Sequence, residues 1–175
     1  MSEWIETSSG TRISRLATIV GASSITISAN CTIHAGCKLN GEEHTGTQKN
    51  PIIILGKNSF LEKDCVVDPP SSNQPEESRV PFVMGNYSTI GERTVVRLSL
   101  VGNRVSIGSD CFLGELSVIN DCCIIENDVK IPPKTVIPPY TRVSGSYDKS
   151  LVMEELSAAY RRVLELDSRL LFSLK

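Results

Sequence analysis

A six-residue period of aliphatic residues constrains this chain more than any other feature of its sequence. From Val101 to Val143 every sixth residue is aliphatic, through Ile107, Leu113, Ile119, Ile125, Ile131 and Ile137. The residue four positions after each of these from Val101 to Ile137 is small or β-branched. Because alternate residues of a strand point to the same side, this position and the next aliphatic position point inward together. Each six-residue unit therefore predicts a short strand and a corner, and three units predict a triangular coil whose strands stack about 4.8 Å apart.

The same frame recurs upstream of Val101. It passes through Ile27, Ile33, Leu39, Leu55, Leu61, Val67, Met84, Ile90 and Val96. The step from Val96 to Val101 is five, so one residue is missing there or one corner is tighter. Two stretches, at about residues 40–53 and 68–83, break the frame and contain Gly and Pro, which predicts loops extruded from the coil. We therefore predict that residues 1–145 form a β-helix with these two loops.

The pattern resembles the hexapeptide-repeat family, whose members are left-handed parallel β-helices. The left hand is implied by that resemblance, since the general rule for connections between parallel strands predicts the opposite hand. Two prolines follow Ile131 and two follow Ile137. Proline cannot donate to a strand ladder, so these pairs suit the end of a solenoid.

After Gly145 the spacing of apolar residues changes to three and four. The positions are Val152, Leu156, Tyr160, Val163, Leu166 and Leu170. This spacing predicts an amphipathic α-helix from about Lys149 to Phe172, within residues 146–175, that folds back on the β-helix as part of the same domain. Its charges are of both signs, which argues against a helix that lies on a membrane.

Four apolar residues fall at positions that should point outward from the β-helix, namely Phe112, Val118, Ile124 and Val136. Val118 and Val136 are 18 residues apart, so they should stack on one face. Exposed apolar patches often mark contacts with other proteins. We expect the helix to cover some of the four and a protein partner to cover the rest.

The six cysteines follow the same period. Five of them fall at the small inward position, namely Cys31, Cys37, Cys65, Cys111 and Cys123. A free cysteine is a small apolar residue, so this placement favours core packing over a disulfide or metal site. Cys122 falls at a corner, where it could be exposed. The N-terminus has no basic stretch followed by an apolar one, which predicts a cytosolic chain with reduced thiols.

Charge and hydropathy argue against two classes of partner. The formal net charge is −2 and no cluster of Lys and Arg is present, so nucleic-acid binding is not expected. The longest apolar runs are a few residues, so membrane insertion is not expected either.

Hexapeptide proteins include acyltransferases, nucleotidyltransferase domains and γ-class carbonic anhydrases, so a catalytic alternative has to be considered. A γ-class carbonic anhydrase needs three histidines for zinc, and this chain has His34 and His44 alone. An acyltransferase uses a histidine as general base, for which His44 in the first loop is the better candidate. There is no basic cluster for coenzyme A. We therefore expect no catalytic residue, cofactor or metal, and a hexapeptide-repeat enzyme remains the alternative.

Three stretches resemble the dynactin subunit 5 family, at residues 3–15, 64–67 and 121–145. The most specific is Asp121-Cys122-Cys123-Ile124-Ile125 with the proline-rich repeats that follow it. The resemblance spans nearly the whole chain. It implies a non-catalytic subunit of the dynactin pointed-end complex, located in the cytoplasm on the microtubule cytoskeleton. Its implied partners are dynactin subunit 6, actin-related protein 11 and dynactin subunit 4, and its implied role is to support attachment of dynein to cargo.

Overall fold

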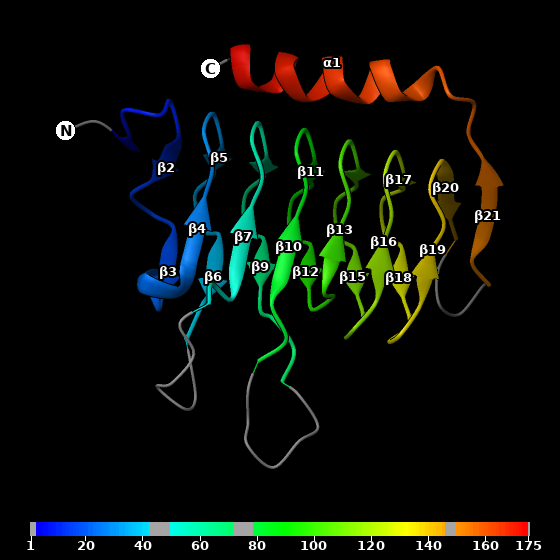
Figure 1. The fold of residues 1–175 in the computed structure, drawn as a ribbon, viewed down its shortest axis with the longest axis horizontal. Helices are drawn as coiled ribbons and strands as arrows, with labels where there is room; N and C mark the ends of the chain where they lie inside the picture. The colour runs from blue at the N-terminus through cyan, green and yellow to red at the C-terminus, as the bar shows by residue number, and fades with distance from the viewer. Residues whose placement is uncertain (1–2, 43–49, 72–78, 146–149, 175) are drawn as a thin grey trace.

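A computed structural model describes residues 3–42, 50–71, 79–145 and 150–174. The chain winds as a left-handed parallel β-helix with three flat faces, and one α-helix runs along its length (Figure 1). Face A holds nine strands, namely β1 (Trp4–Glu6), β2 (Arg12–Ser14), β5 (Thr32–Ile33), β8 (Phe60–Leu61), β11 (Thr89–Ile90), β14 (Ser106–Ile107), β17 (Ile124–Ile125), β20 (Thr141–Ser144) and β21 (Val152–Glu155).

The other two faces hold six strands each. Face B consists of β3 (Thr18–Val20), β6 (Lys38–Asn40), β9 (Val66–Val67), β12 (Val95–Val96), β15 (Phe112–Leu113) and β18 (Lys130–Ile131). Face C consists of β4 (Ile25–Ile27), β7 (Ile53–Leu55), β10 (Phe82–Met84), β13 (Leu100–Val101), β16 (Val118–Ile119) and β19 (Val136–Ile137), and it is turned toward the viewer in Figure 1. A short 3-10 helix, η1 (Ala22–Ser24), leads into β4. Parallel pairing holds throughout except at β1 and β21, which pair antiparallel with β2 and β20.

The strand register confirms both the 18-residue coil and the missing residue. Leu100 pairs with Val118, which is 18 residues further along. Val83 pairs with Leu100, which is 17 residues further along, so one side of that coil is a residue shorter. Leu98 is fully buried in the shortened side.

Each regular corner is made by one residue in the left-handed conformation, three positions after the inward aliphatic residue. From Arg104 to Tyr140 these residues have φ between 55° and 61°, and they include Asp110 and Asp128. Asn and Asp tolerate this conformation better than other residues with a side chain. Asp110 and Asp128 therefore have a local conformational reason to be at corners. Other side chains adopt the same conformation at the remaining corners, namely Arg104, Leu116, Cys122, Lys134 and Tyr140.

The small inward position carries hydrogen-bond donors that bond to the next coil. Thr94 Oγ1 donates to the Gly108 carbonyl at 2.8 Å and accepts from Cys111 N–H at 3.2 Å, and Ser88 is placed in the same way between Gly102 and Val105. The cysteines do likewise, with Sγ to carbonyl distances of 2.9–3.1 Å for Cys31, Cys37, Cys65, Cys111 and Cys123. Five cysteines, Ser88 and Thr94 thus place an S–H or O–H donor at this position, whereas Val105 and Val129 occupy it without one.

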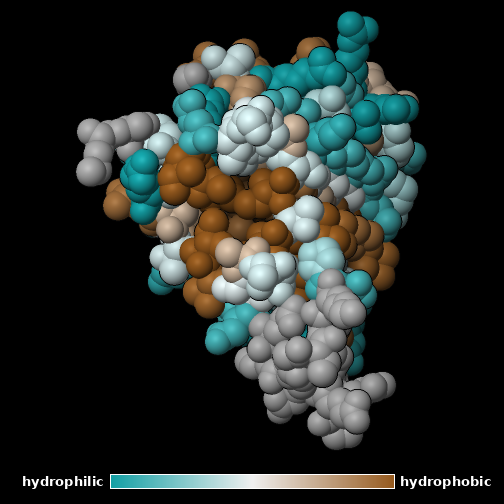
Figure 2. All heavy atoms as spheres, turned by 60° about the vertical axis from the view of Figure 1, so that its left-hand side comes forward, coloured by the Kyte–Doolittle hydropathy of each residue, from teal (hydrophilic) through white to brown (hydrophobic). Residues whose placement is uncertain are grey.

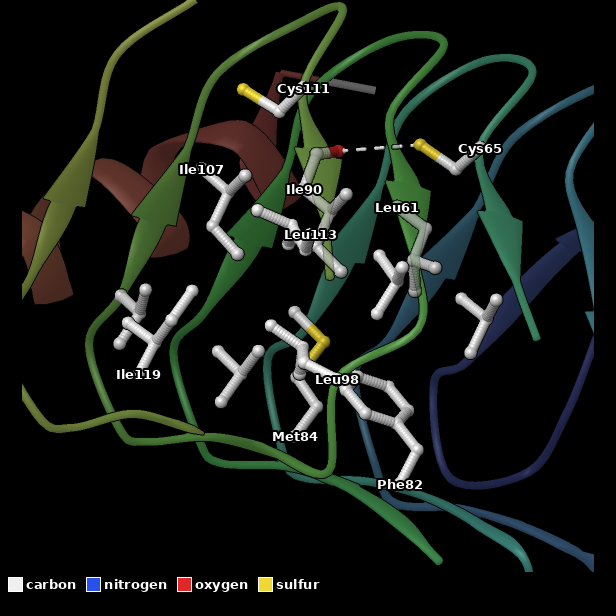
Figure 3. Packing of buried hydrophobic residues seen from close by; sticks show 14 of the residues in the cluster. Leu61, Cys65, Phe82, Met84, Ile90, Leu98, Ile107, Cys111, Leu113 and Ile119 are labelled. Carbon is white, nitrogen blue, oxygen red and sulfur yellow. Dashed lines mark hydrogen bonds between the residues drawn. The ribbon is translucent and has the colours of Figure 1, made fainter. Parts of the chain in front are cut away.

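All six thiols are free and buried, and Cys37, Cys65, Cys111 and Cys123 belong to one continuous hydrophobic core, part of which Figure 3 shows around Cys65 and Cys111. Figure 3 shows Cys65 directed at the Ile90 carbonyl, which lies 3.8 Å from Sγ. The five inward cysteines confirm the prediction of core packing. The expectation that Cys122 could be exposed is wrong, because its side chain is 3% exposed. It lies in a corner row between Arg104 and Tyr140, and the segment that enters the C-terminal helix covers this row through a bond from Leu156 N–H to the Tyr140 carbonyl at 2.7 Å.

The C-terminal helix is shorter than the sequence predicts. We expected it to begin near Lys149, which lies outside the described residues, but Val152–Glu155 form strand β21 and the helix α1 spans Tyr160–Ser173. The open edge of β20 explains this difference, because four consecutive residues of β21 pair with Thr141–Ser144. The helix does fold back on the β-helix, running from the C-terminal end toward the N-terminal end over the row of corners between faces C and A (Figure 1).

A buried polar cluster lies where the two predicted loops leave the coil. Arg79, 8% exposed, donates to the Asn40 carbonyl at 3.0 Å and to Asp68 Oδ1 at 3.1 Å. Asn40 Nδ2 also donates to Asp68 Oδ1, at 3.0 Å. The described ends of both loops are thus joined to each other. β6 ends at Asn40 and β7 begins at Ile53, while β9 ends at Val67 and β10 begins at Phe82.

Candidate functional site

Each face of the prism presents two columns of outward side chains, and the column that directly precedes the inward residues contains one residue from each coil. On face C the paired residues from β4 to β19 are Thr26, Ile54, Val83, Leu100, Val118 and Val136. Five of these six are aliphatic, and they form what we call the face C stripe, comprising Ile54, Val83, Leu100, Val118 and Val136. Val136 at the end of the stripe is 62% exposed and the other four are half-buried.

The outward columns of the other two faces are mixed in character. Face B presents Lys38 and Lys130 together with Thr18, Val66, Val95 and Phe112. Face A presents Thr32, Phe60, Thr89, Ser106, Ile124 and Arg142. The five consecutive aliphatic residues on face C therefore distinguish it as a surface that can exclude water against another protein.

A row of glycines borders the stripe and keeps the face flat. Gly56, Gly85 and Gly102 follow the inward residues of three successive strands. A Cβ at Gly56 would lie 2.6 Å from the backbone of Gly85, and a Cβ at Gly85 would lie 2.6 Å from that of Gly102. Coils can approach at this row because no Cβ is present. The row adds no protruding side chain beside the stripe.

The structure brings together two of the four predicted interface residues. Val118 and Val136 are paired neighbours on face C, as expected from their spacing. Phe112, 39% exposed, lies on face B between Val95 and Lys130, and Ile124 lies on face A between Ser106 and Arg142. The four residues thus point from three different faces.

Three residues of the stripe, Ile54, Val83 and Leu100, were missed by the sequence analysis. Each directly precedes an inward aliphatic residue, so the signal was present. Leu100 lies 18 residues before Val118, so its spacing was regular, whereas the two loops and the 17-residue coil remove that spacing for Ile54 and Val83. Only an alignment of coils corrected for these breaks would have found the column.

The hydrogen bonds and ion pairs that place α1 involve none of the four predicted residues, so the expectation that α1 covers part of them stays a prediction. The polar contacts of α1 are with corner residues: Arg104 Nε bonds Glu165 at 3.0 Å, Ser168 Oγ donates to the Asn58 carbonyl at 2.7 Å, and Arg169 bonds the Tyr87 hydroxyl at 3.2 Å. The guanidinium of Arg104 lowers the pKa of Glu165. The apolar side of the helix, with Leu164 buried, packs against the corners and the adjoining edge of face A. The face C stripe is left uncovered by the helix.

The histidines were the candidates for catalysis. His34 follows β5 on face A, where its ring lies 5.2 Å from the Trp4 ring and 5.2 Å from the Phe60 ring. It is therefore held in an aromatic row that fastens the N-terminal strand. His44 lies outside the described residues. Within the part of the chain that the structure describes, no three His, Cys, Asp or Glu residues are grouped so that they could hold a metal ion.

The described chain also has no helix that is both long and apolar enough to span a lipid bilayer.

Solved structures with the same fold are hexapeptide transferases. A hexapeptide transferase family protein from Anaplasma phagocytophilum superposes with a TM-score of 0.67 at 15% identity, covering 94% of this chain and 90% of that one. A mutant of AntD, an N-acyltransferase from Bacillus cereus in complex with dTDP and coenzyme A, gives 0.67 at 15% identity, covering 93% and 89%. At this identity the likeness shows the fold alone.

The sequence identifies the protein family more specifically than the fold does. Residues 1–167 match the model of the family described as dynactin subunit 5, which leaves only the last eight of the 175 residues unmatched. The match includes the coils, both loop regions and most of α1. The chain therefore belongs to the dynactin subunit 5 family.

Proposed function

We propose that this protein is a non-catalytic structural subunit of the dynactin pointed-end complex, and that the face C stripe is its main protein-binding surface. The observation that carries the proposal is an unbroken aliphatic column of five residues on a flat face, in a chain of the dynactin subunit 5 family. The partners are dynactin subunit 6, actin-related protein 11 and dynactin subunit 4. Through them the subunit supports attachment of dynein cargo on microtubules in the cytoplasm.

A stripe of this kind suits a partner that is itself flat and apolar. The half-buried aliphatic side chains protrude little from the face, so a partner with a matching flat surface can exclude water along the whole length of the column. Phe112 and Ile124 would form secondary contacts around the two neighbouring corners. No cofactor or metal is required for a role of this kind.

The catalytic alternative has less support. His34 is packed between two aromatic rings, and the transferase likeness at 15% identity concerns the fold. A hexapeptide-repeat enzyme would require a base elsewhere, such as His44. Coenzyme A binding by the purified chain, measured by calorimetry and lost on His44→Ala, would favour that alternative.

The experiment is to co-express this chain with dynactin subunit 6, actin-related protein 11 and dynactin subunit 4, and to purify the complex that forms by size-exclusion chromatography. We expect the wild-type chain to co-elute with them and the double variant Val118→Lys/Val136→Lys to be lost from the complex. Phe112→Lys is the matched control on face B, with an expected loss that is several-fold smaller. Co-elution of the double variant at wild-type yield would refute the role of face C, and failure of the wild type to co-elute would refute the proposed subunit role.

A further inference from the structure

The two ends of the β-helix differ in how well the core is covered. At the C-terminal end, the last inward residues Ile131, Ile137 and Val143 are at most 1% exposed. At the N-terminal end, Ile13, Ile19, Ile25 and Ile27 occupy the equivalent inward positions but are only half-buried. The core is therefore open at the N-terminal end.

Exposed apolar side chains surround this opening. Leu16 is 68% exposed, Ile5 46% and Val20 43%. Figure 2, turned so that the N-terminal end comes forward, shows hydrophobic residues gathered across this part of the surface. We call this surface the open end, defined by Leu16, Ile19, Val20, Ile25 and Ile27.

The strand edges of the open end are also available for pairing. Among the described strands, β3 pairs with β6 alone and β4 pairs with β7 alone. Thr18 N–H bonds the Cys37 carbonyl at 2.8 Å and the Val20 carbonyl accepts from Gly41 N–H at 2.9 Å, so both are directed at the second coil. Since backbone groups alternate along a strand, the N–H and C=O of Ile19 point to the opposite, open side. By the same alternation Ile27 presents its N–H and C=O from the edge of β4.

The chemistry of these edges contrasts with that of the C-terminal end. There β18 and β19 are each followed by two prolines, which cannot donate to an added strand. The residues of β3 and β4 are Thr, Ile and Val throughout, with no proline or charge. Proteins usually protect exposed edges with proline, charge or a covering segment. An unprotected β-branched edge beside an open core is typical of a surface that another strand covers.

The fold defines what is missing at this end. Strand β1 already extends face A by one strand beyond the first coil, whereas faces B and C stop at β3 and β4. Two adjacent positions of one further coil are vacant. A segment that fills them has two short strands joined by a corner, with an aliphatic residue directed inward from each strand.

A second copy of this chain does not fit this vacancy. Since β1 protrudes beyond β3 and β4, two copies that meet end to end would touch first at β1 and hold the remaining edges apart. The C-terminal end of another copy carries the prolines and β21, so continuous stacking is blocked as well.

We infer that the open end binds a two-strand segment of a different protein, which adds to the edges of β3 and β4 and closes the core by β-augmentation. This rests on the proposed function, since the segment would belong to another subunit of the reconstituted complex. The open end is separate from the face C stripe, so the two surfaces can be tested independently.

The test uses the same reconstituted complex and two variants, one at the open end and one on α1. Leu16→Glu/Val20→Lys adds charge at exposed positions of the open end, and Leu166→Glu makes the same Leu-to-Glu exchange on α1, where Leu166 is 54% exposed. We expect the double variant to bind its partners at least tenfold more weakly and Leu166→Glu to bind within twofold of wild type. Circular dichroism checks that each variant is folded. In the wild-type complex, amide exchange at Ile19 and Ile27 should slow at least tenfold relative to the free chain.

Three results would overturn the inference. If the open-end variant binds as tightly as wild type while Val118→Lys/Val136→Lys does not, the open end is not a docking surface and the proposed function stands. If the free chain is a dimer by light scattering and Leu16→Glu/Val20→Lys makes it a monomer, the occupant is a second copy. If the wild-type chain enters no complex, the proposed function fails, and the inference that rests on it fails too.

Discussion

The hydroxyl of Thr94 provides a sharp test of why the small inward position carries donors. The side chain is fully buried, and Oγ1 joins the Gly108 carbonyl and the Cys111 N–H across two coils. Thr94→Val keeps the shape but leaves both backbone groups without this partner. Each such group costs about 1–3 kcal/mol, and the added apolar methyl returns about 1 kcal/mol, so we expect a loss of about 3 kcal/mol.

The comparison variant is Thr94→Ser, which keeps the hydroxyl and removes the methyl group. Loss of one buried methyl costs about 1 kcal/mol. If packing alone set the stability, Val would be tolerated better than Ser. The hydrogen-bond argument predicts the reverse order, Thr above Ser above Val. Urea denaturation at constant m-value measures the order, and a Val variant as stable as the Ser variant would refute the reasoning.

Three further predictions follow from burial and close approach. Burial raises the pKa of Cys123 to about 11, so a thiol reagent at pH 8 should label it slowly in the native protein and fully in urea; rapid native labelling would contradict this. Because Arg104 lowers the pKa of Glu165, the ion pair stabilises the fold above the ordinary glutamate value of about 4.3, and this contribution is lost as pH falls through the lowered value. Protection factors of the α1 amides, which correct for the intrinsic pH dependence of exchange, should fall over that range and fall less in Glu165→Gln, and equal pH profiles would count against the pair. Gly102→Ala would place Cβ 2.7 Å from Asp121 N, so we expect thermal denaturation to report a loss of roughly 1–3 kcal/mol, and an unchanged midpoint would show that the coils can separate there.

The coil was predictable because its rule is local and repeated. Inward aliphatic residues, small residues two positions earlier and turn formers at the corners recur every six residues, and the step from Val96 to Val101 located the short coil. The donors at the small position were also visible in the sequence as Cys, Ser and Thr. From the sequence these Cys, Ser and Thr residues could be interpreted only as small side chains, because a hydrogen bond to the next coil becomes evident only when the coils are stacked.

Features that depend on non-local geometry could not be predicted in the same way. Membership of the face C stripe depends on how many residues the loops insert, so Ile54 and Val83 have no fixed spacing to Val118. Strand β21 forms because β20 offers an open edge, and the spacing of Val152 and Leu156 within a longer helical pattern gave no sign of that edge. The position of α1 over a corner depends on partners such as Arg104 and Asn58, which are far away in sequence.

The long path of α1 has a consequence for how the protein folds and unfolds. In a simple solenoid each coil contacts only its neighbours, so the terminal coils can unwind one at a time. Here Leu156 bonds the last coil, Glu165 a middle coil, and the Phe172 carbonyl accepts from Arg12 of the first coil at 2.7 Å. Unwinding of the first coil therefore breaks contacts with the last turn of the helix. Because α1 is synthesised after all of the coils, we expect the coils to stack early and the domain to become cooperative only once α1 has packed on them.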